Sequence, residues 1–155
     1  MVSDPEIVLR LVMAALFSGL IGLEREATGR RAAGLRTHIL VCLGSALIVL
    51  TGLYLWENVQ GGAAIDPTRM GAQVVSGIGF LGAGTIIQLR SDKVLGLTTA
   101  ASLWAVAGIG LAVGSGFYVG GVTATGIVLV VLYGLSRFEK QMEARWKGSD
   151  PERRR

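Results

Sequence analysis

Five apolar segments recur along the chain, with short polar stretches between them. They cover residues 11–23, 35–55, 70–89, 97–113 and 117–135. A helix that crosses a bilayer needs roughly 17 to 25 predominantly apolar residues. The last four segments reach this length almost unaided, and the first reaches it if its helix begins near Pro5. The pattern predicts an all-α integral membrane protein with about five transmembrane helices.

The distribution of charge supports this arrangement and predicts its orientation. Thirteen of the 15 Lys and Arg residues, all except Arg10 and Arg69, fall on one side of a five-span protein. Cytoplasmic loops carry an excess of Lys and Arg. We therefore expect the N-terminus outside and the C-terminus in the cytoplasm. The net charge of +4 then reflects membrane orientation, and no nucleic-acid partner is expected.

The sequence divides into a membrane domain and a basic tail. Residues 1–136 hold the five segments, and residues 137–155 carry seven of the basic side chains. In the tail, Phe138, Met142 and Trp146 recur every fourth residue between Lys and Arg. Basic amphipathic helices bind the surface of anionic membranes. We expect a short helix of this kind on the cytoplasmic leaflet.

Glycine is concentrated in the apolar segments, where small residues let helices approach closely. The third segment is the richest, and the fourth contains Gly110 and Gly114. A G-x-G-x-x-G pattern in the third segment lies within an apolar span, so it does not indicate a dinucleotide site. Two interpretations stay open: close helix packing, or a locally broken helix that lines a pore. The candidate packing or pore-lining residues are Gly77, Gly79, Phe80, Gly82, Ala83 and Gly84.

Polar residues at the start of the third segment form a single stripe. Asp66, Arg69, Gln73 and Ser76 are spaced three, four and three positions apart, so they share one helix face. Polar residues within membranes usually face the bundle interior, and we expect this stripe to do so. Asp66 could alternatively cap the helix, and Arg69 could extend to the headgroups.

Further polar candidates lie where the cytoplasmic ends of the helices are expected. Glu24, Arg25 and Arg36 border the first basic loop, and Thr98, Thr99 and Ser102 begin the fourth segment. Either these charges form solvated local ion pairs, or Glu24 or Arg25 pairs with another helix end, such as Arg36. His38 is the single histidine, and no zinc-type ligand pattern or catalytic constellation is found. The sequence thus predicts no enzyme and no cofactor, and leaves a metal site undetermined.

These polar clusters resemble those of the MgtC/SapB family of bacterial inner-membrane proteins. The matching stretches are Gly22-Leu-Glu-Arg-Glu with Gly34-Leu-Arg-Thr-His38, Asp66-Pro-Thr-Arg69 with residues 73–86, and residues 96–104. The resemblance implies a role in adaptation to low magnesium and association with other membrane proteins. It also extends the candidates for binding an ion or a partner to Thr37. Family members linked to virulence usually carry a soluble C-terminal domain, and we expect a short form without it.

Two functions from different classes follow. The first is a non-enzymatic modulator of other membrane proteins, present in the lipid bilayer of the inner membrane as a homodimer or with another protein. The second is a small ion transporter or channel for Mg²⁺ or another cation, with the polar stripe of the third helix as its path.

Overall fold

The computed structural model describes residues 2–27, 32–58, 66–88 and 94–148, and side chains for these residues except 87–88 and 136–148. Within these ranges there are five α-helices and one short hairpin. The helices are α1 (Asp4–Ala27), α2 (Leu35–Asn58), α3 (Thr68–Thr85), α4 (Leu97–Gly114) and α5 (Tyr118–Gly148). Between α3 and α4, β1 (Ile87–Gln88) pairs antiparallel with β2 (Val94–Leu95). The five predicted helices are confirmed, and the hairpin was not predicted.

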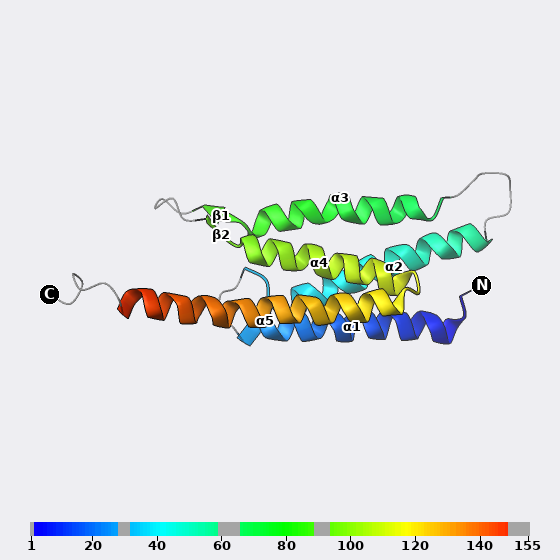
Figure 1. Cartoon of the computed structure of the whole chain (residues 1–155). Coiled ribbons are helices and arrows are strands. Elements are labelled where there is room, and N and C mark those ends of the chain that lie inside the picture. Colours follow the sequence, from blue (N-terminus) through cyan, green and yellow to red (C-terminus); the bar gives the residue numbers. More distant parts are fainter. Residues whose placement is uncertain (1, 28–31, 59–65, 89–93, 149–155) are drawn as a thin grey trace.

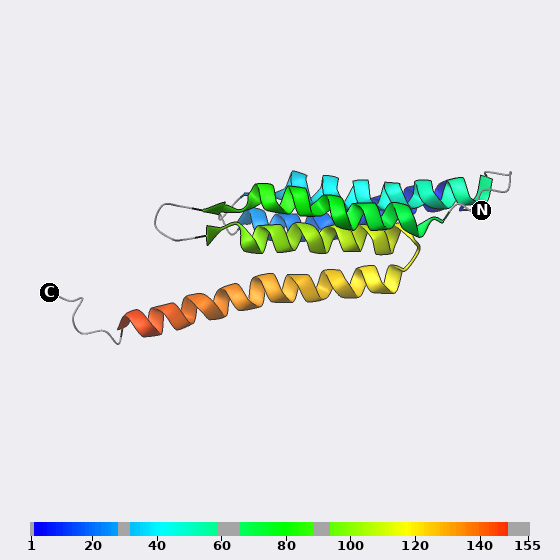
Figure 2. The ribbon, with the colours of Figure 1, turned by 90° about the horizontal axis from the view of Figure 1, so that it is seen from above.

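The helices run side by side along a common axis, and α1 begins at the end of the bundle opposite to that where α5 finishes (Figure 1). Helix α2 packs against both α1 and α4 at the centre. Helix α3 lies mainly against α4, while α5 contacts α4 and α1. Figure 2 shows α5 along one edge of the molecule. The placement leaves α3 and α5 as the peripheral helices.

Four helices are long and apolar enough to cross a membrane. They are α1, α2, α4 and residues Tyr118–Leu135 of α5. Helix α3 is not among them, because Arg69, Gln73 and its many glycines lower its mean hydropathy. It nevertheless lies alongside the other helices over a comparable length (Figure 1). The protein is therefore a multi-pass membrane protein.

Small residues form the contact between the central helices. A Cβ atom added at Gly114 would lie 2.7 Å from the carbonyl oxygen of Ala46, and one at Gly110 would overlap the carbonyl oxygen of Cys42. A Cβ atom at Gly22 would lie 2.8 Å from Cα of Leu35. Glycine therefore lets α4 and α1 approach the α2 backbone, in the manner of small-residue contacts in membrane proteins.

Helix α5 differs from expectation at its C-terminal end. Its backbone continues without a break from Tyr118 to Gly148, over 31 residues. The expected tail helix is therefore an extension of the fifth helix and does not begin as a separate element. Strong helix formers across residues 136–148, with no glycine or proline before Gly148, account for this continuity.

Candidate functional site

Four buried polar side chains meet where the end of α1 and the beginnings of α2 and α4 come together. They are Arg25, His38, Thr99 and Ser102, each at most 9 % exposed, and we refer to them as the buried polar cluster. Burying a polar group is costly unless it is hydrogen-bonded. The hydrogen bonds of this cluster therefore decide whether it stabilises the bundle.

His38 is the centre of the cluster and is fully buried. Its Nδ1 atom lies 2.8 Å from the carbonyl oxygen of Gly34, and its Nε2 atom lies 2.9 Å from Oγ of Ser102. A carbonyl oxygen only accepts, so Nδ1 carries a proton when it bonds Gly34. Nε2 is then an acceptor in the neutral imidazole and a donor in the imidazolium.

The hydroxyl of Ser102 is shared between two possible acceptors. Its Oγ atom lies 2.8 Å from the carbonyl oxygen of Thr99 and can donate to it, but the same proton could go to Nε2 of His38. In the imidazolium form, His38 donates to Ser102, and Ser102 donates to Thr99. In the neutral form one hydroxyl proton serves two acceptors. Reorienting one hydroxyl group therefore lets the hydrogen bonds adjust to either protonation state of His38.

Arg25 connects this network to α1. Its guanidinium donates to Oγ1 of Thr99 at 3.3 Å, across 74 positions of sequence. At the same end of α1, Oε2 of Glu26 accepts the backbone N–H of Leu35 at 3.1 Å. Glu24 directly precedes Arg25 in sequence, and both of its carboxylate oxygens are buried. The end of α1 is therefore tied to the first turns of both α2 and α4.

The structure brings together only part of the predicted set at the helix ends. Arg25, Thr99 and Ser102 belong to the cluster, whereas Arg36, Thr37 and Thr98 are exposed. We expected Glu24 or Arg25 to pair with another helix end, such as Arg36, and the structure gives a hydrogen bond from Arg25 to Thr99 at the start of α4. His38 was missed as a site residue, because a single histidine carries no ligand pattern. The available signal was its position at the expected cytoplasmic end of the second segment, the same side of the membrane as the hydroxyl-rich start of the fourth segment.

The stripe on α3 lies opposite to the predicted direction. Asp66, Arg69, Gln73 and Ser76 are all exposed, whereas the buried residues of α3 are Ile78 and Gly82. Within one chain the stripe is therefore exposed and not buried in the bundle, although Gln73 also borders an open groove between α2 and α3. Its spacing correctly gave a common face, but spacing does not show which face meets the bundle. Helix α3 contacts α4 through the side that carries Gly82, because a small residue lets the two helices approach closely.

Asp66 has the alternative role that its sequence suggested. Its Oδ1 atom accepts the backbone N–H of Thr68 at 2.9 Å and the Thr68 hydroxyl at 2.6 Å. These hydrogen bonds lower the pKa of Asp66, first through the hydroxyl group and then through the backbone. Asp66 thus fixes the start of α3 as an exposed carboxylate outside the membrane-spanning segments.

The glycine-rich part of α3 is a continuous helix, so the interpretation as a locally broken helix is wrong. Gly82 faces Ala100, whose Cβ atom would lie 3.6 Å from an added Cβ atom. At Gly77, Gly79 and Gly84 an added Cβ atom would meet nothing within 4 Å. Ala83 is exposed, and Phe80 is 84 % exposed. Among the residues that the structure describes, Gly82 is therefore the one member of this set that packs against another helix.

A second polar contact lies at the other end of the bundle. Arg10 is 7 % exposed and donates to the carbonyl oxygen of Gly114 at 2.7 Å. Its guanidinium also bonds the carboxylate of Glu6 and the hydroxyl of Tyr118. These contacts join α1 to the connection between α4 and α5. Among the described residues there is no group of three or more His, Cys, Asp or Glu side chains that could hold a metal ion.

The family model and the individual relatives that match this chain point to the same protein family. The model of the MgtC family matches residues 11–141. "Putative magnesium transporter YhiD" of Escherichia coli K12 is 44 % identical over 129 residues, covering 82 % of this chain and 59 % of that protein. "Protein SapB" of Bacillus subtilis is 41 % identical over 117 residues, covering 74 % and 50 %. "Protein MgtC" of Salmonella typhimurium LT2 is 43 % identical over 122 residues, covering 79 % and 49 %.

These relatives are longer than the chain, which spans between about half and three fifths of their length. The shared part contains the buried polar cluster and the α3 stripe, since both lie within residues 11–141. No solved structure matches the chain. The extent of the family match and the identity to these three relatives show that the chain belongs to the MgtC family.

Proposed function

We propose that this protein is a non-enzymatic modulator of another membrane protein in magnesium-related physiology of the bacterial inner membrane. The observation that carries the proposal is the outward direction of the α3 stripe. Gln73 and Ser76 are exposed at positions where a membrane-embedded helix would meet lipid. A polar side chain facing hydrocarbon is costly. A protein partner that accepts hydrogen bonds from this face would remove that cost.

The surroundings of the stripe favour a helix as the partner. Gly79 lies three positions after Ser76 on the exposed side of α3, and an added Cβ atom at Gly79 or Gly84 would meet nothing within 4 Å. Small residues next to polar ones are typical of helix contacts in membranes, where close backbone approach and hydrogen bonds replace the hydrophobic effect. The partner helix belongs either to a second copy, which would give a homodimer, or to a different membrane protein.

The proposed orientation places the N-terminus outside and the C-terminus in the cytoplasm. It requires α3 to cross the membrane with the other four helices. The support is the excess of Lys and Arg on one side and the placement of α3 along the bundle (Figure 1). Cysteine labelling from outside the cell at Thr68→Cys, but not at Thr98→Cys, is the expected outcome. Labelling of both positions would contradict a membrane-spanning α3.

The buried polar cluster supports this function indirectly. It fixes the ends of α1, α2 and α4 relative to one another, and α4 in turn holds α3 through Gly82 and Ala100. The direction in which α3 presents its polar face is therefore set by the cluster and by glycine packing. The stretches that resemble the family would then lie on several helices because most of them position α3, and α3 is the helix that we propose contacts the partner.

A small ion transporter is the second candidate, and the YhiD relative of Escherichia coli is named a putative magnesium transporter. The specific observation in its favour is the His38–Ser102–Thr99 chain, which offers two proton arrangements. The guanidinium of Arg25 lies in the same cluster and would repel a divalent cation. Mg²⁺ also prefers oxygen ligands, often carboxylates. The cluster therefore argues against Mg²⁺ binding, and its two hydrogen-bond arrangements make a proton the cation to test first.

Two measurements on the same preparations separate these functions. The first is flux of Mg²⁺, K⁺, Na⁺ and H⁺ into liposomes that contain the full chain. The second is photocrosslinking in the native membrane from a reactive residue at position 73, with position 130 on α5 as a matched exposed control, since Val130 is 71 % exposed.

We expect no flux and a discrete crosslinked product from position 73 alone. If ion flux is observed, if Ser102→Ala abolishes it and if no crosslinked product forms, the protein is a transporter and not a modulator.

A further inference from the structure

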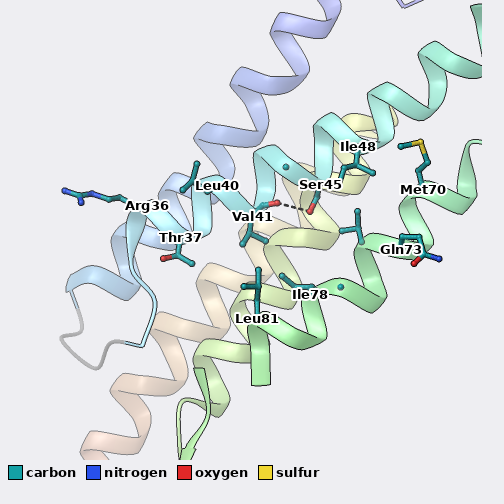
Figure 3. A pocket seen from close by; sticks show the side chains of 13 residues that line it. Arg36, Thr37, Leu40, Val41, Ser45, Ile48, Met70, Gln73, Ile78 and Leu81 are labelled. Atoms are coloured by element: carbon teal, nitrogen blue, oxygen red, sulfur yellow. Dashed lines mark hydrogen bonds between the residues drawn. The ribbon is translucent and has the colours of Figure 1, made fainter. Parts of the chain in front are cut away.

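A groove with a volume of about 740 Å³ lies between α2 and α3 (Figure 3). Its walls are mainly apolar, with Leu40 and Ile48 on α2 and Ile78 and Leu81 on α3. Glycines at positions 44 and 77 create the space, because an added Cβ atom at either would meet nothing within 4 Å. None of the residues of the buried polar cluster lines this groove.

The groove is open to the surroundings of the bundle along its length. Leu40 is 69 % exposed and Leu81 is 48 % exposed, although both line it. Helix α2 is long and apolar enough to span a membrane, so the molecules that meet its middle turns are lipid acyl chains. An occupant that enters sideways from the bilayer must itself be apolar over most of its length.

The length of the groove corresponds to one leaflet and not to the whole bilayer. Arg36 and Ile48, the outermost lining residues of α2, are twelve positions apart, or about 18 Å of helix at 1.5 Å per residue. The hydrocarbon core of a bilayer is about 30 Å thick, so one leaflet contributes about half of that. This length fits a single acyl chain better than a helix that crosses the membrane.

The groove also closes before the outer end of α2. At Gly52, one turn beyond Ile48, an added Cβ atom would lie 3.2 Å from the carbonyl oxygen of Pro67 and 3.4 Å from Sδ of Met70. The two helices therefore touch there. A partner helix running the full width of the membrane would have to leave the groove at this contact, whereas an acyl chain would end below it.

The two ends of the groove differ in charge. Figure 3 shows Arg36 and Thr37 at one end and Met70 and Gln73 at the other. Arg36 is exposed at the first turn of α2, where an apolar helix meets the headgroup layer. Arginine binds phosphate oxygens with two parallel hydrogen bonds, and Thr37 adds a hydroxyl group. Basic residues at this level attract anionic lipids.

We propose that this groove is a binding site for an anionic phospholipid of the leaflet on the side of Arg36. One acyl chain lies between α2 and α3, and the phosphate group is held by Arg36 and Thr37. The bound lipid fills the space that Gly44 and Gly77 leave and supports α3, which is otherwise held mainly by α4. The groove shares Gln73 and Gly77 with the exposed side of α3, but this proposal stands apart from the proposed function because Arg36 and Gly44 of α2 carry it and lipid retention tests it.

The test is retention of lipid by the purified full chain, measured by native mass spectrometry after exchange into nanodiscs of equal phosphatidylglycerol and phosphatidylcholine. The wild type is expected to retain one phosphatidylglycerol per chain in preference to phosphatidylcholine. Arg36→Gln is expected to reduce that preference roughly fivefold, the equivalent of about 1 kcal/mol for one basic side chain at an anionic surface. Gly44→Leu is expected to abolish retention of both lipids, because the new side chain fills the groove.

Two matched variants serve as controls. Arg69→Gln removes an exposed arginine at the start of α3, far along the groove from Arg36. Gly126→Leu introduces a leucine, as Gly44→Leu does, at a glycine of α5 where an added Cβ atom would meet nothing within 4 Å. Both are expected to retain lipid like the wild type. Unfolding measurements on each variant establish that the fold is kept, and Arg36 is exposed, so its replacement leaves the core unchanged.

Four outcomes would overturn the proposal. The first is equal retention by the wild type and Arg36→Gln, and the second is unchanged retention in Gly44→Leu. The third is a change in the monomer–dimer equilibrium of Gly44→Leu without a change in lipid retention, which would make the groove a contact for a second copy. Loss of lipid in Arg69→Gln to the same extent as in Arg36→Gln would also contradict it, since the attraction would then be a general effect of surface charge.

Discussion

The imidazole Nε2 of His38 on α2 lies 2.9 Å from the hydroxyl oxygen of Ser102 on α4, across 64 positions of sequence. Both side chains are buried, and the contact joins the two helices at the centre of the bundle. A histidine that belongs to no ligand pattern and a serine near the start of a helix therefore form one hydrogen-bonded pair. The predictions below begin with this pair.

Ser102→Ala is expected to destabilise the bundle by about 1–2 kcal/mol, because His38 loses a buried hydrogen-bond partner. The measurement is the unfolding free energy in mixed detergent micelles. Thr98→Ala is the control, since Thr98 is exposed on the same helix, and it should change stability by less than about 0.5 kcal/mol. Equal effects of the two substitutions would show that the His38–Ser102 contact contributes nothing.

Gly110→Ala tests the close contact of α4 with α2. An added Cβ atom at Gly110 would overlap the carbonyl oxygen of Cys42, so we expect a loss of about 1–3 kcal/mol from overpacking. Gly108→Ala is the matched substitution two positions earlier, where nothing lies within 4 Å. It should leave stability unchanged or raise it by up to about 1 kcal/mol through helix propensity. Comparable losses at both positions would argue against a specific α2–α4 contact at Gly110.

Arg10→Met is expected to loosen the connection between α4 and α5, because it removes the hydrogen bond to the carbonyl oxygen of Gly114. Hydrogen bonds to charged groups contribute about 1.5–3 kcal/mol. Hydrogen exchange of the backbone amides at residues 115–118 should become faster than in the wild type. Arg36→Gln, at an exposed arginine, should leave these amides unchanged, and faster exchange in that variant as well would assign the effect to net charge.

The direction of α3 can be checked with nitroxide labels at positions 73 and 78. In nanodiscs with one chain each, a label at Gln73 should be mobile and accessible to oxygen, because that side chain is exposed. A label at Ile78, which is 6 % exposed, should be immobile. The reverse pattern would restore the interior-facing stripe. Immobilisation at 73 in native membranes alone would indicate the proposed partner.

The hydrogen bonds of Asp66 predict a pH dependence at the start of α3. Since its pKa is lowered in the folded protein, the carboxylate favours the folded helix start at pH values above the unfolded pKa, about 3.9. This contribution is lost as the pH falls below that value through the folded pKa. Carbon NMR titration of Asp66 should show a higher pKa in Thr68→Ala. An unchanged pKa would mean that the Thr68 hydroxyl does not act on it.

The sequence by itself determined the class of the protein and most of its elements. Apolar segments of bilayer length predict helices because a membrane leaves no other way to satisfy backbone groups locally. Each boundary then follows from local residues such as Asp66 and Pro67, and the fifth helix differs only by continuing past Leu135. The spacing of Asp66, Arg69, Gln73 and Ser76 likewise fixed one common helix face, since a helix period is a local property.

The tertiary structure alone decided which faces meet. Gln73 is exposed and Ile78 is buried because α3 packs on α4 through Gly82, and no local pattern contains the position of α4. His38, Arg25, Thr99 and Ser102 became one site because three helix ends converge, which depends on glycine contacts such as Gly110 with Cys42. Periodicity is a short-range property of one helix, whereas burial depends on contacts between residues far apart in the chain.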